Sequence, residues 1–338
     1  MIGILLINLG TPSSPTVPAV RRYLREFLLD PRVIDINPIA RWLLVNFIIV
    51  PFRSPKTTAA YQKIWTQKES PLLLFTRALG VATGKLLGEN FSVEIGMRYG
   101  KPSIEEGIHK LVAKGVKEIR ILPLYPQYAS STTESSIAKV FAVLKKFTEP
   151  PAIQILPPFF EHPGFVKSFA EIGKPILENF RPDHILFSFH GLPERHILKG
   201  DLSQKHCLKK PDCCEEIIPA NGLCYRAHCF QSAYAIAKEL NLSESEYTIC
   251  FQSRLGRTPW IKPFTDVVLK DLVHQGKKRI AVFCPSFVAD CLETLEEVAI
   301  RYRDLWKEHG GKDLMLIPSL NDHPRWVEAV GQMLKGEN

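Results

Sequence analysis

Two hydrophobic periodicities alternate along this chain. Short runs rich in β-branched and aromatic residues predict strands at residues 2–8, 93–97, 118–123, 184–190, 247–252 and 279–284. Apolar residues at helical spacing predict helices between them, at residues 103–114, 131–146, 229–240, 263–275 and 290–307. Strands that alternate with helices are typical of parallel sheets with crossover helices, so we expect an α/β fold.

A proline-rich stretch near the middle divides this pattern in two. Residues 147–158 contain four prolines and end one series of strands and helices just before the next begins. A chain of 338 residues suits two domains of about 150 residues each. We predict two doubly wound domains, over residues 1–160 and 161–320. A final helix within residues 320–338 could pack on either domain, the first included.

The composition indicates a basic protein without a nucleic-acid signature. Lys and Arg number 43 against 35 Asp and Glu, a formal charge of +8, which favours an anionic partner. No basic block or zinc finger occurs, so we expect no nucleic-acid partner. The run Gly80-x-x-x-Gly84-Lys85 lies in a helical pattern and has one spacer too few for a phosphate loop. A bound nucleotide is therefore not expected.

Several features bear on location. The first residues lack a basic leader and fit a buried strand better than a signal peptide. The apolar segment 42–52 is far shorter than the roughly 20 residues of a membrane helix. It is either a half-buried helix or a lip that touches a membrane or an apolar ligand. Eight cysteines in such a chain favour the cytosol, so we expect a cytoplasmic protein, at most peripheral at the inner face of the membrane.

Candidate chemistry lies at the carboxyl ends of two predicted strands. His190 ends one of them, and Asp290, Glu293 and Glu297 follow the other. Open α/β sheets place ligands at this edge, where an imidazole and carboxylates handle protons and divalent metals. A structural reading stays open for each: His190 can be a satisfied structural residue, and Asp290 with Glu293 matches a helix capping box. Three acids along one helix side, however, cost stability unless protons or cations intervene.

Other segments that follow predicted strands would rim the same crevice. They supply aromatic, hydroxyl and cationic groups, as a large flat apolar ligand with acidic tails would require. The candidates are Tyr125, Gln252, Ser253, Trp260 and Phe287.

The chain resembles the ferrochelatases, which insert ferrous iron into a porphyrin. The resemblance covers nearly the whole length and rests on a series of motifs in order. These are Asn8-Leu9-Gly10-Thr11-Pro12, Met97-Arg98-Tyr99, Tyr125-Pro126-Gln127-Tyr128 with Ser131-Thr132-Thr133, Ser188-Phe189-His190-Gly191-Leu192-Pro193, Gln252-Ser253-Arg254 with Pro259-Trp260, and Asp290 with Leu292-Glu293-Thr294-Leu295.

The resemblance implies two flavodoxin-like domains with four-stranded parallel sheets and protoporphyrin IX between them, metallated to protohaem in the terminal step of haem biosynthesis. His190 would take pyrrole protons or contact Fe²⁺, and Glu293 would be its partner across the macrocycle. Asp290 and Glu297 would form the acidic path behind Glu293. Insertion expels two N–H protons, so a base must lie on the ring face. The family lines its cleft or lip at positions that here hold Leu9, Arg53, Tyr61, Ser70, Arg98, Tyr99 and segment 42–52.

Two departures from the family pattern bear on the reaction. Cys291 stands where animal relatives have a second histidine, and many bacterial members look similar there, so we do not expect it to be an essential base. Leu9 replaces the tyrosine of coproporphyrin-using relatives, which favours protoporphyrin IX. The alternatives are a coproporphyrin or other tetrapyrrole chelatase and, in a different class, a non-catalytic haem carrier or iron–sulfur sensor.

Five of the eight cysteines lie in one insert, residues 205–229: Cys207, Cys213, Cys214, Cys224 and Cys229. Basic neighbours are expected to lower the pKa of these thiols, and such a group suits a 2Fe–2S cluster or a zinc ion, which the spacing does not distinguish. Animal ferrochelatases hold their cluster with a cysteine where Ser130 stands and with cysteines of a C-terminal tail beyond the position of Asn338, so we do not expect that site here. The insert resembles an internal segment of certain bacterial members, so we expect a 2Fe–2S cluster at four of the five cysteines.

Overall fold

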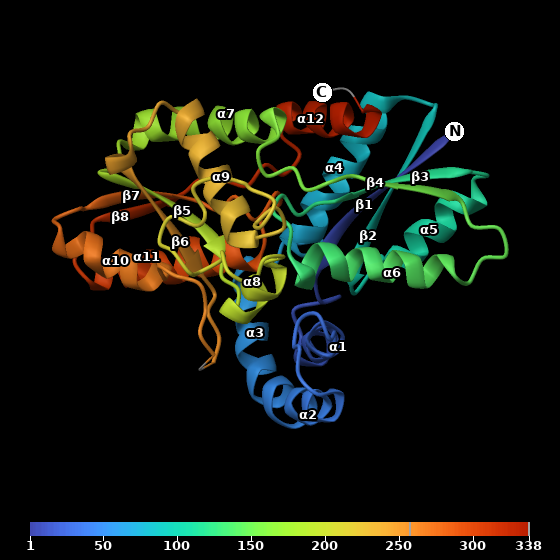
Figure 1. Cartoon of the computed structure of the whole chain (residues 1–338), viewed down its shortest axis with the longest axis horizontal. Helices are drawn as coiled ribbons and strands as arrows, with labels where there is room; N and C mark the ends of the chain where they lie inside the picture. The colour runs from blue at the N-terminus through green and yellow to red at the C-terminus, as the bar shows by residue number, and fades with distance from the viewer. Residues whose placement is uncertain (257, 337–338) are drawn as a thin grey trace. The chain divides into compact units, whose positions relative to one another are not determined.

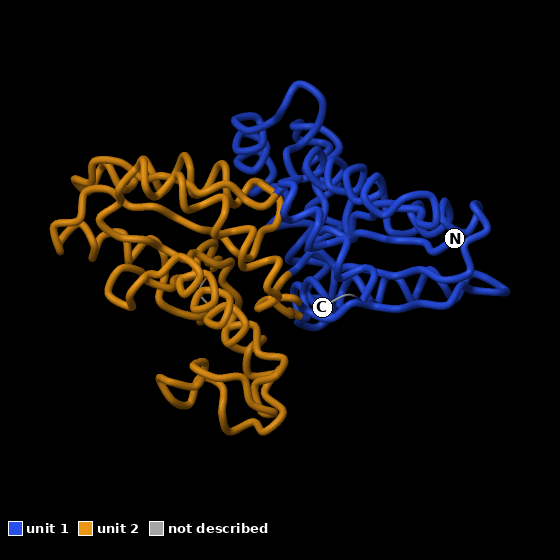
Figure 2. The backbone as a smooth tube through the Cα atoms, turned by 90° about the horizontal axis from the view of Figure 1, so that it is seen from above, with its two compact units in different colours: residues 1–125, 130–158, 321–338 blue, residues 126–129, 159–320 orange. Residues whose placement is uncertain are grey.

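The computed structural model describes residues 1–256 and 258–336, so Arg257 and the last two residues lie outside the described part. The chain divides into two compact units (Figure 2). One comprises residues 1–125, 130–158 and 321–338, and the other residues 126–129 and 159–320. Each unit holds a four-stranded parallel sheet.

The sheet of the first unit has the order β2-β1-β3-β4, which is flavodoxin-like. Its parallel strands are β1 (Ile2–Gly10), β2 (Phe91–Tyr99), β3 (Glu118–Pro123) and β4 (Ala152–Ile155). β1 is a continuous apolar run and is almost entirely buried, as expected for a parallel strand covered on both faces.

Helices cover both faces of this sheet (Figure 1). Ile95 of β2 meets Gly80 of α4 (Pro71–Leu87), whereas the next residue, Gly96, lies against Ile104 of α5 (Ile104–Ala113). Because successive strand residues point to opposite faces, α4 and α5 lie on opposite sides. The other helices of the unit are α1 (Val17–Leu28), α2 (Pro38–Leu43), η1 (Leu44–Ile49), α3 (Val50–Ile64), η2 (Ser130–Glu134), α6 (Ser135–Leu144) and α12 (Pro324–Lys335).

The second unit repeats this plan with the order β6-β5-β7-β8. Its parallel strands are β5 (His184–His190), β6 (Tyr247–Gln252), β7 (Arg279–Phe283) and β8 (Asp313–Leu316). Two doubly wound, four-stranded parallel sheets confirm the predicted fold class. The short edge strands β4 and β8 were not predicted from the sequence.

The sheet of the second unit is also covered on both faces (Figure 1). The Phe169 ring of α7 packs on Phe283 of β7, and Trp306, fully buried, joins a core cluster with Leu269 and Val282. The helices of this unit are α7 (Pro163–Phe180), α8 (Glu194–Gly200), α9 (Tyr225–Glu239), η3 (Glu244–Glu246), α10 (Thr265–His274), η4 (Leu292–Tyr302) and α11 (Arg303–Glu308).

The helices that follow β3 and β7 differ from the predicted α-helices. The predicted helices 131–146 and 290–307 both begin as π-helices, η2 and η4, before continuing as α6 and α11. A π-helix is rare and is frequently found at functional sites. η2 follows β3 and η4 follows β7, each strand lying beside the first strand of its sheet, whereas the third π-helix, η1, lies between α2 and α3.

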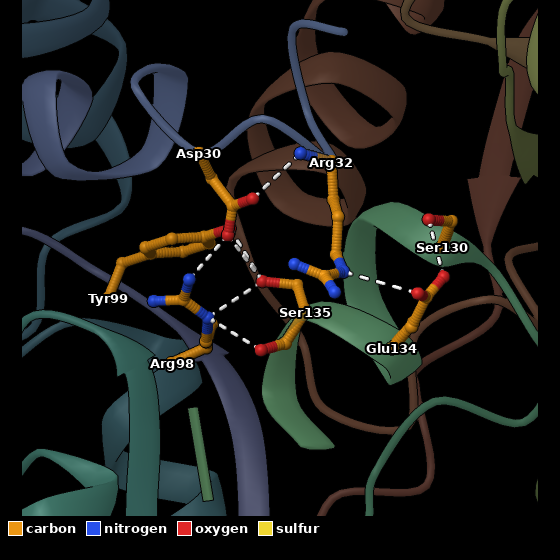
Figure 3. A network of polar contacts seen from close by, with 7 residues as sticks. All are labelled: Asp30, Arg32, Arg98, Tyr99, Ser130, Glu134 and Ser135. Atoms are coloured by element: carbon orange, nitrogen blue, oxygen red, sulfur yellow. Dashed lines mark hydrogen bonds and ion pairs between the residues drawn. The ribbon is translucent and has the colours of Figure 1, made fainter. Parts of the chain in front are cut away.

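A buried polar network lies at the carboxyl end of β2 (Figure 3). Asp30 is 5% exposed and forms an ion pair with Arg98. It also accepts hydrogen bonds from Ser135 Oγ at 2.6 Å, the Tyr99 hydroxyl at 3.0 Å and the Arg32 backbone N–H at 2.8 Å. The network therefore joins the segment after α1 to β2 and to the start of α6.

The same network reaches η2. Arg32 Nε lies 3.4 Å from Oε1 of Glu134, and Ser130 Oγ donates to Oε2 of the same carboxylate at 2.7 Å (Figure 3). Burial by itself would raise the pKa of Asp30. Hydrogen bonds from Ser135 and the Arg32 backbone, with the charge of Arg98, outweigh it and hold that pKa below its usual value.

Asp30→Asn is expected to lower the free energy of unfolding by about 3 kcal/mol, because it leaves Arg98 without its anionic partner. The folded-state pKa of Asp30 is depressed, so its contribution is present above the unfolded pKa of roughly 4 and is lost as pH falls through the folded value. Urea unfolding of wild type and variant at pH 7 and in acid measures both effects.

The exposed Asp322→Asn variant, in the same unit, serves as the control and should unfold like wild type at both pH values. Equal stability of Asp30→Asn and wild type at pH 7 would contradict a stabilising network.

Candidate functional site

His190 ends β5 at the carboxyl edge of the second unit's sheet. β5 lies between β6 and β7, so its end is the point where the strand order reverses. Doubly wound sheets bind ligands at this point. The equivalent position in the first unit is the end of β1, where Leu9 and Gly10 lie.

The chain turns immediately after His190. The Gly191 N–H donates to the Gln252 carbonyl at 2.8 Å, and a Cβ at Gly191 would also lie 2.8 Å from that oxygen, so the position favours glycine. His190 Nδ1 lies 2.6 Å from the Gly191 carbonyl oxygen. Because a carbonyl only accepts, Nδ1 carries the proton, and Nε2 of the neutral ring is left as the basic nitrogen. Trp260 and Phe287 flank the imidazole, with ring centroids at 6.5 and 6.3 Å.

The acidic segment forms the π-helix η4, and its start differs from the capping box considered above. Cys291 is the N-cap, and Thr294 is its capping partner. Asp290 precedes the helix, is 5% exposed and accepts hydrogen bonds from Thr294 Oγ1 at 2.9 Å and the Ser319 N–H at 3.3 Å. The Asp290–Glu293 capping box, one of the two readings left open from the sequence, is therefore wrong, because the helix begins one residue later than that pattern requires.

Glu297 is held by several donors although only 6% of it is exposed. Ser253 Oγ donates to it at 2.5 Å, Gln252 Nε2 at 3.3 Å and the Tyr302 hydroxyl at 3.2 Å. The Arg301 guanidinium lies 3.6 Å away. Charge-assisted hydrogen bonds of this kind satisfy a buried carboxylate.

Gln252 connects the histidine strand to the acidic helix. Its Oε1 accepts from Ser188 of β5 at 2.8 Å, and its Nε2 donates to the Glu293 backbone carbonyl at 3.0 Å. Ser253 has a φ of +67°, which strains a residue that is not glycine, and in this conformation its hydroxyl reaches Glu297. The polar groups of the Gln252 and Ser253 side chains thus form hydrogen bonds with η4. Their predicted contact with a substrate stays a prediction.

Cys291 is buried beside Glu293. Burial, and then the neighbouring Glu293 carboxylate, raise the pKa of the Cys291 thiol well above its usual value. A neutral thiol is a poor base at neutral pH.

The predicted substrate residues of the first unit differ in exposure. Arg53 is exposed, Leu9 is partly exposed and Tyr61 is 6% exposed. Ser70 is the N-cap of α4 and accepts from the Leu73 N–H at 3.4 Å. Their contact with a substrate also stays a prediction.

Three more of these residues have internal polar partners. Arg98 and Tyr99 belong to the Asp30 network, and the Tyr125 hydroxyl pairs with Ser136 Oγ at 3.2 Å. Burial raises the pKa of both tyrosines, so their hydroxyls stay protonated.

Segment 42–52 is helical and partly exposed. Its exposed apolar side chains include Trp42 at 51%, Phe47 at 62% and Phe52 at 76% exposure, whereas Val45 and Val50 are fully buried. The segment is therefore a half-buried helix, and its contact with a membrane or an apolar ligand stays a prediction. Across the described residues, none of the helices combines the length and the apolar character needed to cross a bilayer.

The cysteine-rich insert buries all five of its thiols. Cys213 and Cys214 have their sulfurs 3.7 Å apart. Cys207, Cys224 and Cys229 are likewise buried. The insert thus holds one close pair of thiols and three further buried thiols.

Hydrogen-bond donors contact two of these sulfurs, and an acidic side chain orders the loop that carries them. Arg226 Nη1 lies 3.0 Å from the Cys214 sulfur, and the Leu208 N–H donates to the Cys213 sulfur at 3.4 Å. Asp201 accepts from the backbone N–H groups of His206 and Cys207, each at 2.8 Å, which orders the start of the loop.

The expected lowering of thiol pKa in this insert is wrong for Cys207, Cys213 and Cys229. Burial is the largest influence and raises the pKa of each thiol, to about 11 for Cys207. For Cys214 the hydrogen bond with Cys224 and burial together raise the pKa despite Arg226. Within residues 1–256 and 258–336, no group of three or more His, Cys, Asp or Glu side chains is arranged as a metal site.

Several site residues were not identified from the sequence. Asp30 is followed by Pro31, which signals only a turn, and its partner Arg98 is 68 positions away. Ser135 and Tyr302 lie in helical patterns that give no sign of a polar partner.

Known proteins place the chain. The family model described as ferrochelatase matches residues 1–337. A ferrochelatase of Coxiella burnetii (strain CbuK_Q154) is 48% identical over 334 residues, which cover 99% of this chain and 93% of the relative. A ferrochelatase of Legionella pneumophila (strain Corby) is 47% identical over 329 residues, 97% of each chain. The solved structure of SirB from Bacillus subtilis with Fe³⁺ has a TM-score of 0.54 at 14% identity, over 99% of this chain and 94% of that one, a likeness of fold. The chain therefore belongs to the ferrochelatase family.

Proposed function

We propose that this chain inserts Fe²⁺ into protoporphyrin IX and releases the two pyrrole N–H protons. The observation that carries the proposal is the state of His190. Its Nδ1 is committed to the Gly191 carbonyl, and its basic Nε2 lies at the switch point of the sheet. A base held in one tautomer at this position can accept a pyrrole proton as the metal enters.

The acids of the second unit complete the proton chemistry in this proposal. Glu293 is the half-buried partner of His190 in handling the metal and protons, and its backbone is fixed by Gln252. Asp290 and Glu297, both buried and hydrogen-bonded, form the acidic path behind it. Their hydroxyl partners, Thr294 and Ser253, can pass protons because hydroxyls both donate and accept.

The apolar Leu9 at the end of β1 supports protoporphyrin IX as the substrate over coproporphyrin, which has two more carboxylates. Arg53, an exposed cation, suits a propionate. Together with Leu9 and Arg53, nine further residues are proposed to contact the macrocycle. These are Tyr61, Ser70, Arg98, Tyr99, Tyr125, Gln252, Ser253, Trp260 and Phe287.

His190→Ala is expected to reduce metal insertion by roughly 100-fold or more, because it removes the proton acceptor. Anaerobic incubation with Fe²⁺ or Zn²⁺ and protoporphyrin IX, followed by absorbance, measures the rate. A parallel incubation with coproporphyrin tests the substrate. Wild-type turnover by His190→Ala would overturn its assignment.

His274→Ala is a matched control, since His274 is exposed at the end of α10 in the same unit. It should keep the wild-type rate. If the wild-type chain retains one haem per chain and metallates no porphyrin, it is a haem carrier. If it metallates coproporphyrin faster than protoporphyrin IX, it is a coproporphyrin chelatase.

We further propose that the insert holds a 2Fe–2S cluster through Cys207, Cys213, Cys214 and Cys224. The four thiols are buried between α8 and the start of α9, and the Cys213 and Cys214 sulfurs lie 3.7 Å apart. The Arg226 side chain points at the Cys214 sulfur and the Leu208 N–H at the Cys213 sulfur, as donors to cluster ligands do. The ligands bind as thiolates, so the raised thiol pKa values make assembly release protons. We leave Cys229 outside this set because it lies within α9, whereas the other four precede the helix or cap it.

Chain purified without oxygen should contain two iron atoms and two sulfides per molecule and show visible absorbance in addition to that of haem. Cys214→Ser is expected to lose both, whereas Cys229→Ser should keep them. One zinc per chain without sulfide would refute the cluster. Equal iron content in the two variants would refute the proposed ligand set.

We also propose that the exposed apolar side chains of segment 42–52 contact the membrane surface. Apolar helix faces bind at the interface, and anionic lipids favour a chain with a formal charge of +8. A cytoplasmic location, peripheral at the inner face of the membrane, stays a prediction.

The double variant Phe47→Ser and Phe52→Ser should bind anionic vesicles at least tenfold more weakly, because two exposed aromatic rings are lost. Sedimentation with vesicles gives the bound fraction. Phe141→Ser, which removes a 49% exposed ring from α6, is the control and should bind like wild type. Equal binding by the double variant would contradict the contact.

A further inference from the structure

Helix α9 begins inside the cysteine-rich insert, and its first residue, Tyr225, reaches His190. Cys224 is the N-cap of this helix, and Tyr225 is 7% exposed. The Tyr225 hydroxyl donates to the His190 backbone carbonyl at 2.8 Å. A residue of the insert is therefore in direct contact with the backbone of the proposed base.

The contact is part of a closed ring of hydrogen bonds. The His190 N–H donates to Ser286 Oγ at 3.4 Å, and Ser286 Oγ lies 2.9 Å from the Tyr225 hydroxyl. Because the Tyr225 proton goes to the His190 carbonyl, the Ser286 proton must go to the Tyr225 oxygen. The ring runs in one direction from the His190 N–H back to the His190 carbonyl, and such chains reinforce one another.

Tyr225 has residues of the cysteine-rich insert on both sides in the sequence. Cys224, just before it, is the N-cap of α9 and is buried. Arg226, just after it, reaches the Cys214 sulfur at 3.0 Å. The Cys214 sulfur lies 3.7 Å from that of Cys213. The first turn of α9 is therefore tied to these two thiols through Arg226.

The helix is also fixed farther along. The His228 ring stacks on Phe160 with centroids 3.8 Å apart, and its Nδ1 accepts the Tyr128 N–H at 3.1 Å. His228 holds the helix from its fourth residue onward, so a change at the thiols acts on the three residues before it, Tyr225 among them.

We propose that Tyr225 is a positioning residue for metal insertion, through which the cysteine-rich insert sets the backbone, and so the imidazole, of His190. The inference rests on the proposed role of His190 as the proton acceptor. It requires no contact between Tyr225 and the porphyrin. A misplacement of about 1 Å at a reacting group can cost 100-fold in rate, so a clamp on this backbone has a measurable effect.

Tyr225→Phe keeps the ring and removes the hydroxyl. We expect kcat for Zn²⁺ or Fe²⁺ insertion to fall about tenfold. KM for the porphyrin should change less than twofold, since the residues assigned to contact the porphyrin are untouched. Hydrogen exchange at the backbone of residues 186–192 should speed up in the variant without porphyrin or metal substrate present. Ser286→Ala opens the same ring without altering α9 and should also speed exchange there.

Tyr234→Phe is the control, because Tyr234 lies farther along α9 and packs on Phe230 with ring centroids 6.0 Å apart. It should match wild type in kcat and in exchange. Unchanged exchange and kcat in Tyr225→Phe would overturn the proposal, as would an equal loss in Tyr234→Phe.

The link to the insert is tested by combining changes. Cys214→Ser, or Arg226→Gln if that variant folds poorly, should speed exchange at residues 186–192 in the chain that keeps Tyr225. Combined with Tyr225→Phe, it should add little, because the path is already cut. Additive effects would overturn the link.

The readouts separate this proposal from the proposed function. If wild type inserts no metal but exchange at residues 186–192 responds to Tyr225→Phe and Cys214→Ser as described, the linkage stands and the function fails. If wild type inserts metal and exchange does not respond, the function stands and the linkage fails.

Discussion

The side chain of Gln252 fixes the relation between the two halves of the candidate proton site. It accepts from Ser188 of β5, and it donates to the Glu293 carbonyl of η4. The backbone carbonyl of Gln252 accepts a hydrogen bond from the Gly191 N–H, which forces the turn that follows His190. One residue at the end of β6 thus holds the histidine and the acidic helix in one frame. A buried amide with both ends satisfied is rigid, and neither end can be changed without leaving a partner unpaired.

That frame explains why a costly acidic helix is tolerated. Glu297 is buried, yet hydroxyl, amide and guanidinium groups surround it, and Asp290 is paired with Thr294 and Ser319. These donors come from β6, from η4 itself and from the segment after β8. These donors offset the cost of burying the two carboxylates, and removal of one donor leaves a buried acceptor unsatisfied.

The sequence identified the fold because its parallel strands are nearly continuous apolar runs. β4 and β8 escaped because they are four-residue edge strands, and half of β4 is exposed. The π-helices were predicted as α-helices because their apolar spacing also fits an α-helix. The positions of His190 and the acids followed from their place after strands. The directions of the Gln252 and Ser253 side chains did not, because they depend on η4, whose Glu293 carbonyl is 41 positions from Gln252.

The placement of α12 has a consequence for synthesis on the ribosome. The first unit includes residues 321–338, so every residue of the second unit is translated before the first is complete. Arg120 of β3 donates to the Leu334 carbonyl at 2.7 Å, and Gly331 packs closely on Leu86 of α4. Until α12 emerges, that face of α4 has no cover. The unit that is translated first is therefore the last to close, and the nascent chain has an apolar face that chaperones can bind.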